Sequence, residues 1–248
     1  MAPMDRTTRQ PVRLTVSIVI FNSALDLLQR TLDSVYRSAH AARAAGSLDG
    51  IRLHLVNNTP DPGYREQVNR LVERWPHSSD CPLSYHEPAD NLGFGAGNNS
   101  VSALLDSDYH LVLNPDVELA EDALTLGLQR MASEPDIVLL SPSVCGPDGE
   151  REYLCKQYPS VLLLLLRGFA PALLRRPFRQ RLEEYEMRAA CSTDELVSVP
   201  LASGCFMLLR TAALRRVGGF AESYFLYFED FDLSLRLASQ GRVAFDPQ

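Results

Sequence analysis

The sequence contains no pair of cysteines with Cys-x-x-Cys spacing, and this absence limits what its thiols can do. Its five cysteines are an odd and scattered set: Cys81, Cys145, Cys155, Cys191 and Cys205. Disulfide frameworks and zinc clusters use even or closely spaced cysteines. We therefore expect reduced thiols and a cytoplasmic protein.

Long runs of one residue class are also missing. No stretch reaches the roughly 20 uninterrupted apolar residues of a spanning helix, and the net charge of −7 comes without a long basic run. Nucleic acid is therefore not an expected partner, because nucleic-acid binders use concentrated positive charge. Residues 1–13 are polar and are expected to be disordered. The apolar run that follows is too short and too β-branched for a signal peptide.

Strand-like and helix-like segments alternate through the first half of the chain. The apolar, β-branched run at 14–21 has the pattern of a strand buried on both faces. Further strands are expected at 51–56, 83–86 and 109–113, and helices at 25–45, 64–75 and 95–105. This alternation is typical of a doubly wound α/β fold.

The second half interrupts this alternation. After a helix at 121–133 and a strand at 137–141, an insertion is expected at about 149–193. Its segment 161–181 combines an apolar run with several arginines, so it could lie on an anionic membrane surface or form a helix pair with solvated arginines. A strand at 205–209 and helices at 212–217 and 231–239 follow. Residues 243–248 resemble the start of another strand, which suggests a C-terminally truncated chain.

Three motifs carry groups that could do chemistry, and each has a purely structural alternative. Asn114-Pro115-Asp116 follows an expected strand, where one carboxylate can hold a divalent cation against a diphosphate; it is also ordinary turn chemistry. Residues 91–99, NLGFGAGNN, could let a ligand approach the backbone or could serve tight packing. Residues 228–233, FEDFDL, could supply a general base or only complement a helix dipole.

Two nucleotide-binding fingerprints are missing. The glycine spacing is GxGxG after the third strand, and the sequence contains neither GxGxxG nor GxxxxGK[ST]. Nicotinamide-dependent enzymes and P-loop enzymes are therefore disfavoured.

Taken in order, four segments of the chain resemble family 2 glycosyltransferases, particularly the bacterial rhamnosyltransferase-like branch. The segments are VSIVIFNS (16–23), NLGFGAGNN (91–99), HLVLNPDVEL (110–119) and SGCFMLLR…VGGF…YFLYFEDFDLSLR (203–236). The resemblance implies a GT-A fold, with a Rossmann-like, mostly parallel central sheet and flanking helices. It places a nucleotide-sugar-binding half at 14–119 and an acceptor half at 120–248.

The same resemblance implies a role for each matching residue. Asp230 would be the general base and Glu229 would orient the acceptor, with Gly204 and Asp232 also on the acceptor side. Asp116 would bind Mg²⁺ or Mn²⁺. The residues implied at the donor are Phe21, Asn22, Asn57, Asn58, Asn91, Gly93, Gly97, Asn99, Asn114 and Asp116.

Two departures from the family pattern are visible. Asn57-Asn58 stands where the family usually has Asp-Asn, although an amide oxygen can still accept a base N–H. The family commonly has a histidine metal ligand after the acidic motif, whereas every histidine here lies upstream: His40, His54, His77, His86 and His110. We expect that a metal ligand is missing from this chain.

The resemblance therefore implies an inverting glycosyltransferase that faces the cytoplasm, and the segment 161–181 could hold it at the inner face of the cell membrane. It would transfer L-rhamnose from dTDP-L-rhamnose to a bacterial surface glycan or polyprenyl-linked acceptor. A UDP-hexose donor, or a non-catalytic domain that binds sugar nucleotides or acts as a membrane scaffold, is the alternative. A nucleotidyltransferase ranks last, because no basic glycine-rich loop follows the first strand.

Overall fold

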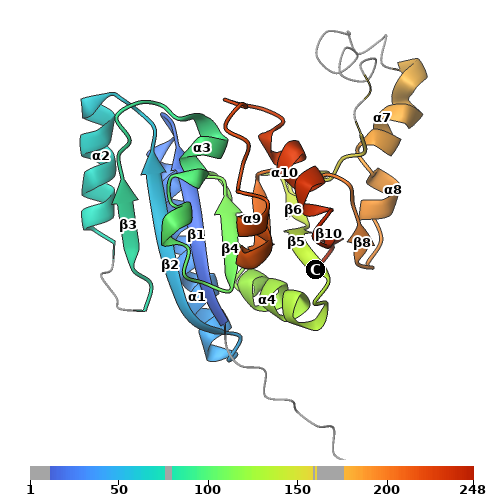
Figure 1. The fold of residues 1–248 in the computed structure, drawn as a ribbon, viewed down its shortest axis with the longest axis horizontal. Coiled ribbons are helices and arrows are strands. Elements are labelled where there is room, and N and C mark those ends of the chain that lie inside the picture. The colour runs from blue at the N-terminus through green and yellow to red at the C-terminus, as the bar shows by residue number, and fades with distance from the viewer. Residues whose placement is uncertain (1–11, 76–79, 159, 161–175) are drawn as a thin grey trace, which may run out of the picture.

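An eight-stranded sheet forms the centre of the computed structural model, which describes residues 12–75, 80–158, 160 and 176–248 (Figure 1). The strand order is β3-β2-β1-β4-β9-β5-β10-β8. The strands are β1 (Val12–Ile20), β2 (Leu48–Asn57), β3 (Leu83–His86), β4 (Tyr109–Leu113), β5 (Ile137–Pro142), β8 (Val197–Ser198), β9 (Phe206–Arg210) and β10 (Arg242–Asp246). A separate hairpin joins β6 (Val144–Cys145) to β7 (Arg151–Glu152).

Most neighbouring strands of the central sheet are parallel. Strands β3, β2, β1 and β4 run in one direction, while β9 lies antiparallel between β4 and β5. Strand β10 is parallel to β5, and β8 is antiparallel to β10. The expected α/β architecture with a mostly parallel sheet is confirmed.

Helices cover both faces of this sheet, and each face has its own core. The helices are α1 (Leu25–Ala44), α2 (Pro62–Glu73), α3 (Gly93–Asn99), α4 (Ala123–Ser133), α7 (Arg179–Tyr185), α8 (Arg188–Cys191), α9 (Thr211–Arg216) and α10 (Glu229–Leu237). Successive residues of β4 show the division: Leu111 packs into the core under α1 and α4, and Val112 into the core under α9 and α10. This follows from the alternation of side chains along a strand.

The face of β1 and β4 beneath α3 carries a cluster of buried polar side chains. His110 is buried between two hydroxyls, with its Nδ1 atom 2.9 Å from Thr15 Oγ1 and its Nε2 atom 3.0 Å from Ser17 Oγ. Ser17 in turn donates to Asn98 Oδ1 of α3 at 2.5 Å. These contacts satisfy the buried polar groups and fix α3 against the sheet.

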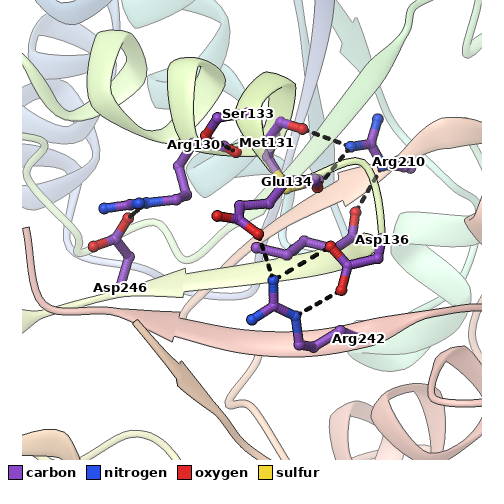
Figure 2. Close-up of polar contacts among 9 residues, drawn as sticks. Arg130, Met131, Ser133, Glu134, Asp136, Arg210, Arg242 and Asp246 are labelled. Carbon is purple, nitrogen blue, oxygen red and sulfur yellow. Dashed lines mark hydrogen bonds and ion pairs between the residues drawn. The ribbon is translucent and has the colours of Figure 1, made fainter. Parts of the chain in front are cut away.

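Charged side chains link strands β9 and β10 to the residues between α4 and β5 (Figure 2). Arg242 of β10 pairs with Glu134 and Asp136, at 2.8 and 2.9 Å. Arg210 donates to the carbonyls of Ile137, Met131 and Glu134. The network therefore ties β9 and β10 to the turn between α4 and β5, which fixes the antiparallel strand in the sheet.

Several boundaries differ from the sequence-based expectation. Strand β1 begins at Val12, so two residues of the expected disordered segment belong to the sheet, and residues 1–11 lie outside the described residues. The helix expected at 95–105 is replaced by the shorter α3 and a 3₁₀ turn at Ser102–Leu104. Glycine is a poor helix former, and tertiary contacts rather than helical propensity set the length of α3.

The insertion is only partly described. Residues 161–175, which carry most of the expected membrane-contacting segment, lie outside the described residues. In the rest, the 3₁₀ turn Arg176–Phe178 leads into α7, where Arg179 pairs with Glu183 at 2.7 Å. No helix among the described residues is long and apolar enough to cross a bilayer. Membrane contact therefore stays a prediction.

Candidate active site

The sheet has a topological switch point between β1 and β4. Chain order runs outward from β1 through β2 to β3 on one side, and continues at β4 on the other. Ligands of open α/β sheets bind at the carboxyl ends of strands at such a point. In Figure 1 this is the upper edge of the sheet, where α3 also lies.

The ends of β1 and β2 place four predicted donor residues at this edge. Phe21 is 51% exposed, and Asn22 adopts a left-handed backbone conformation with φ of 49°. Asn57 and Asn58 are both buried. The first two are therefore accessible to a ligand, while the second two lie beneath the surface of the edge.

The amide of Asn57 is occupied within the fold. Its Oδ1 atom accepts from Thr59 N at 3.0 Å and its Nδ2 atom donates to Tyr85 Oη at 2.8 Å. Tyr85 then donates to Glu87 Oε1 at 2.7 Å. Position 57 has no carboxylate, but its amide is linked through Tyr85 to the carboxylate of Glu87, which follows β3.

Asn58 has a different set of contacts. Its Nδ2 atom donates to the Gly93 carbonyl at 2.8 Å, whereas no described residue makes a hydrogen bond to its buried Oδ1 atom. An unpaired buried acceptor is costly in a folded protein. The amide oxygen of Asn58 is therefore unpaired, but it is buried beneath the edge rather than open to a ligand.

The glycines of the NLGFGAGNN motif allow close packing between several elements. A Cβ atom on Gly93 would lie 2.2 Å from the Phe225 carbonyl oxygen, and Gly93 also has a φ of +79°. A Cβ atom on Gly95 would lie 3.0 Å from Phe220 Cβ, and one on Gly97 would lie 3.0 Å from Val19 Cγ1. Tight packing, the structural alternative weighed for this motif, is therefore what these glycines do in the described structure.

The first and last asparagines of the motif organise its backbone. Asn91 Oδ1 accepts from Gly93 N at 2.9 Å. Asn99 forms two hydrogen bonds with the backbone of Phe220, accepting at 2.9 Å and donating at 2.8 Å. Asn99 therefore binds a segment from the other half of the chain, and its side chain is engaged there.

Asp116 lies in the turn after β4 and is exposed. The turn is anchored on both sides: Asn114 N donates to Cys205 O at 3.0 Å, and Thr31 Oγ1 donates to Pro115 O at 2.9 Å. Within the described part of the chain, no hydrogen bond or ion pair engages the Asp116 carboxylate. The fold thus presents a free carboxylate at the ligand-binding edge.

Asp230 is held by two backbone N–H groups at the start of α10. Gly204 N donates to Oδ2 at 2.9 Å and Phe231 N donates to Oδ1 at 2.8 Å. Burial raises the pKa of Asp230, and these two hydrogen bonds oppose the rise. Gly204 and Cys205 are consecutive, so this dipeptide connects the Asp230 carboxylate to the turn that carries Asp116.

Glu229 and Asp232 differ sharply although they share one helical turn with Asp230. Glu229 is buried, its Oε2 atom has no partner among the described residues, and burial followed by the charge of Asp230 raises its pKa. Asp232 pairs with Arg236 at 2.7 Å, and Arg236 also donates to the Gly219 carbonyl at 2.7 Å. Asp232 therefore supports the turn before the aromatic residues rather than facing an open site.

A single carboxylate suits a divalent cation that takes its other ligands from a diphosphate and water. Asp116 meets that requirement because it is exposed and unpaired. No cluster of three or more metal-ligating side chains occurs within the ranges that the structure describes. Among the described histidines, His54 and His110 are buried within the sheet, so these two rings are not available to a metal at this edge.

Two residues that lie at this edge were not predicted as site residues from the sequence. Thr59 Oγ1 accepts from Asn22 N at 2.8 Å, and Arg65 donates to the carbonyls of Thr59 and Pro88. Thr59 lies in the turn cluster after the second strand, but its contacts depend on strand register and carry no local signal.

The model of "Glycosyl transferase family 2" matches residues 15–218. The chain belongs to this family. It is 31% identical over 191 residues to an N-acetylglucosaminyl-diphospho-decaprenol L-rhamnosyltransferase of Mycobacterium tuberculosis, covering 68% of the chain and 56% of that protein. It is 28% identical over 160 residues to rhamnosyltransferase WbbL of Escherichia coli K12, covering 60% of the chain and 55% of the relative. The chain thus spans about half the length of these relatives.

Solved structures confirm the fold. The mannosyltransferase PcManGT of Pyrobaculum calidifontis, in complex with GDP-Man and Mn²⁺, has a TM-score of 0.65 at 18% identity, covering 97% of this chain and 56% of that one. GalNAc-T7 with UDP, GalNAc and Mn²⁺ has a TM-score of 0.64 at 13% identity, covering 96% and 43%. The expected GT-A fold and family are both confirmed.

Proposed function

We propose that this protein transfers a sugar from a nucleotide-diphosphate donor to a hydroxyl of a glycan or polyprenyl-linked acceptor. The observation that carries the proposal is the Gly204-Cys205 dipeptide, which joins a half-buried, oriented carboxylate to the turn with a free one. Family membership supports the reaction class. We propose dTDP-L-rhamnose as the donor and L-rhamnose as the transferred sugar, because the two curated relatives described above are named rhamnosyltransferases.

In the proposed mechanism Asp230 accepts the proton of the acceptor hydroxyl as that oxygen bonds to the anomeric carbon of the donor. The bond from this carbon to the diphosphate oxygen breaks in the same displacement, so the configuration inverts. The two N–H groups on Asp230 hold its carboxylate in one orientation, which general-base catalysis requires.

The remaining proposed residues bind the donor. Phe21 and Asn22 would contact the nucleobase and ribose, while Asn57 and Asn58, which are buried, would shape the edge that the donor contacts. Asp116 would hold Mg²⁺ or Mn²⁺, which supplies positive charge for the departing diphosphate. Gly204 and Asp232 support this arrangement on the acceptor side.

The first experiment is a thermal-shift screen of dTDP, UDP, GDP and CDP with and without Mn²⁺, because a ligand of the native state raises Tm. A metal-dependent shift with dTDP supports the rhamnose donor. Saturable binding of UDP-sugars without competition by dTDP would overturn it in favour of a UDP-hexose.

Asp230→Asn separates an enzyme from a non-catalytic binding domain. We expect the variant to bind the donor as the wild type does and to lose turnover, by about 10²-fold or more for a lost general base. Asp49→Asn is the matched control, because Asp49 is an exposed carboxylate near the opposite end of β2. Full turnover in the Asp230 variant would refute the proposed base. Donor binding with no transfer or hydrolysis in the wild type would indicate the binding domain.

A further inference from the structure

The segment 220–228, which we call the aromatic segment, ends in five consecutive exposed side chains. Their exposed fractions are 37% for Tyr224, 58% for Phe225, 54% for Leu226, 73% for Tyr227 and 44% for Phe228. Isolated exposed apolar residues are ordinary, but a contiguous group of this size marks a binding surface in a soluble domain.

The backbone of this segment is held in an unfavourable conformation. Tyr227 and Phe228 both adopt left-handed φ values, 70° and 69°. Bulky residues rarely do so, and strained backbone of this kind clusters at functional sites. The conformation also directs large apolar side chains toward solvent, so the fold gains little from it.

Anchors at both ends keep the segment in place. At its start, Asn99 holds the Phe220 backbone by two hydrogen bonds. In the middle, Phe225 packs directly over Gly93, where even a Cβ atom would not fit. At its end, Asp232 N donates to Phe228 O at 2.9 Å. The segment therefore extends from the proposed donor loop to the proposed base.

Phe228 is the member of this segment that adjoins the base. Its ring packs edge to face on Phe231 with a centroid distance of 5.8 Å, and the Phe231 N–H holds the Asp230 carboxylate. A ring presented beside a general base can stack on the apolar face of a pyranose whose hydroxyl reaches that base. The exposed carboxylate of Glu222 in the same segment makes an anionic bilayer surface a poor alternative occupant.

We propose that Phe228, supported by Phe231, is the stacking platform for the sugar ring of the acceptor and determines acceptor affinity. This inference rests on the proposed function for the identity of the base. It adds a residue and a mode of recognition: an aromatic ring against a pyranose, with the other exposed aromatic residues flanking it.

The test measures binding without turnover, so that it does not depend on activity. The probe is N-acetylglucosaminyl diphospho-undecanol, added with dTDP and Mn²⁺, and saturation-transfer NMR reports which probe protons contact the protein. We expect the strongest transfer to pyranose protons in the wild type. Phe228→Ala should weaken binding about tenfold, consistent with the loss of one aromatic stack and its buried area.

Matched variants distinguish stacking from general apolar contact. Phe228→Tyr should retain affinity within about threefold, whereas Phe228→Leu, which keeps apolar bulk without a ring, should lose most of it. Leu235→Ala truncates another exposed apolar residue, 45% exposed on α10, and should bind as the wild type does. Binding of dTDP should be unchanged in all four variants.

Four outcomes would overturn the proposal, and the first three concern the variants and the probe protons. They are wild-type affinity in Phe228→Ala, an equal loss in Leu235→Ala, or saturation transfer confined to the undecyl chain, which would indicate a lipid-binding surface instead. Absence of any probe binding in the wild type would also refute it. Failure of the proposed function is a separate result, because it appears as the absence of nucleotide binding or transfer in the wild type.

Discussion

The backbone N–H of Gly204 lies 2.9 Å from Oδ2 of Asp230 and joins two segments that are 26 residues apart in sequence. This contact orients the carboxylate but also stabilises its charged form, whereas burial disfavours that form. Burial is the larger effect, so the pKa of Asp230 lies above its usual range.

The raised pKa predicts a specific pH dependence. A general base must be ionised to act, so turnover should fall on the acid side with a midpoint above the ordinary aspartate pKa of about 4. The measurement is kcat/KM against pH. A midpoint at or below the ordinary value would contradict the role of burial.

Glu229→Gln tests which carboxyl group causes the fall in turnover on the acid side. The charge of Asp230 raises the pKa of Glu229, which means that Asp230 ionises first. We therefore expect Glu229→Gln to leave the acid midpoint in place while reducing turnover. A midpoint that disappears in Glu229→Gln but persists in Asp230→Asn would exchange the two roles.

Gly93→Ala should be far more damaging than an ordinary glycine substitution. The new Cβ atom would meet the Phe225 carbonyl at 2.2 Å, in addition to the strain of a φ of +79°. Gly46→Ala is the matched control, because Gly46 has a φ of +69° with nothing within 4 Å. We expect about 1 kcal/mol of destabilisation for Gly46→Ala and 1–3 kcal/mol more for Gly93→Ala, by denaturant unfolding. Equal losses would show that the close approach is unimportant.

Much of this architecture follows from local sequence, but the positions of the site residues do not. Apolar runs and turn residues predict β1, β3 and β4 within two residues, because burial pattern and turn chemistry act locally. The glycines at 93, 95 and 97 were visible as a motif, yet their partners Phe225, Phe220 and Val19 are set by tertiary packing.

The acidic motif illustrates the same limit. The sequence shows three carboxylates in one turn, but only the fold separates the backbone-held Asp230 from the unpaired Glu229 and the ion-paired Asp232. Nor did composition single out Tyr224 to Phe228 as exposed, since aromatic residues are usually core residues.

Asn99→Asp should release the aromatic segment without altering the sheet. The aspartate keeps an acceptor for Phe220 N but loses the donor to Phe220 O, and it places a charge beside that carbonyl. We expect faster cleavage of the segment by chymotrypsin at native pH, with an unchanged unfolding cooperativity. Asn69→Asp on α2 is the control and should digest as the wild type does. An unchanged cleavage rate in Asn99→Asp would show that the segment is held by other contacts.

The buried histidines predict how stability depends on pH. Burial, followed by the charge of a neighbouring histidine, lowers the pKa of His54 to about 4 and of His110 to about 3, from the usual 6.5. In the unfolded chain both would protonate near pH 6.5, so stability is complete above that pH and is lost as pH falls toward the folded-state values. Each histidine should contribute a slope of about 1.4 kcal/mol per pH unit between roughly pH 4 and 6.

Urea unfolding at a series of pH values measures this slope directly. His110→Gln should reduce it by one histidine's contribution, whatever the variant's overall stability, because glutamine does not titrate. His40→Gln, at an exposed position, is the matched control for replacing a histidine by glutamine. A wild-type slope near zero across this range would mean that His54 and His110 bind protons alike in the folded and unfolded states, which would contradict the lowering of their pKa by burial.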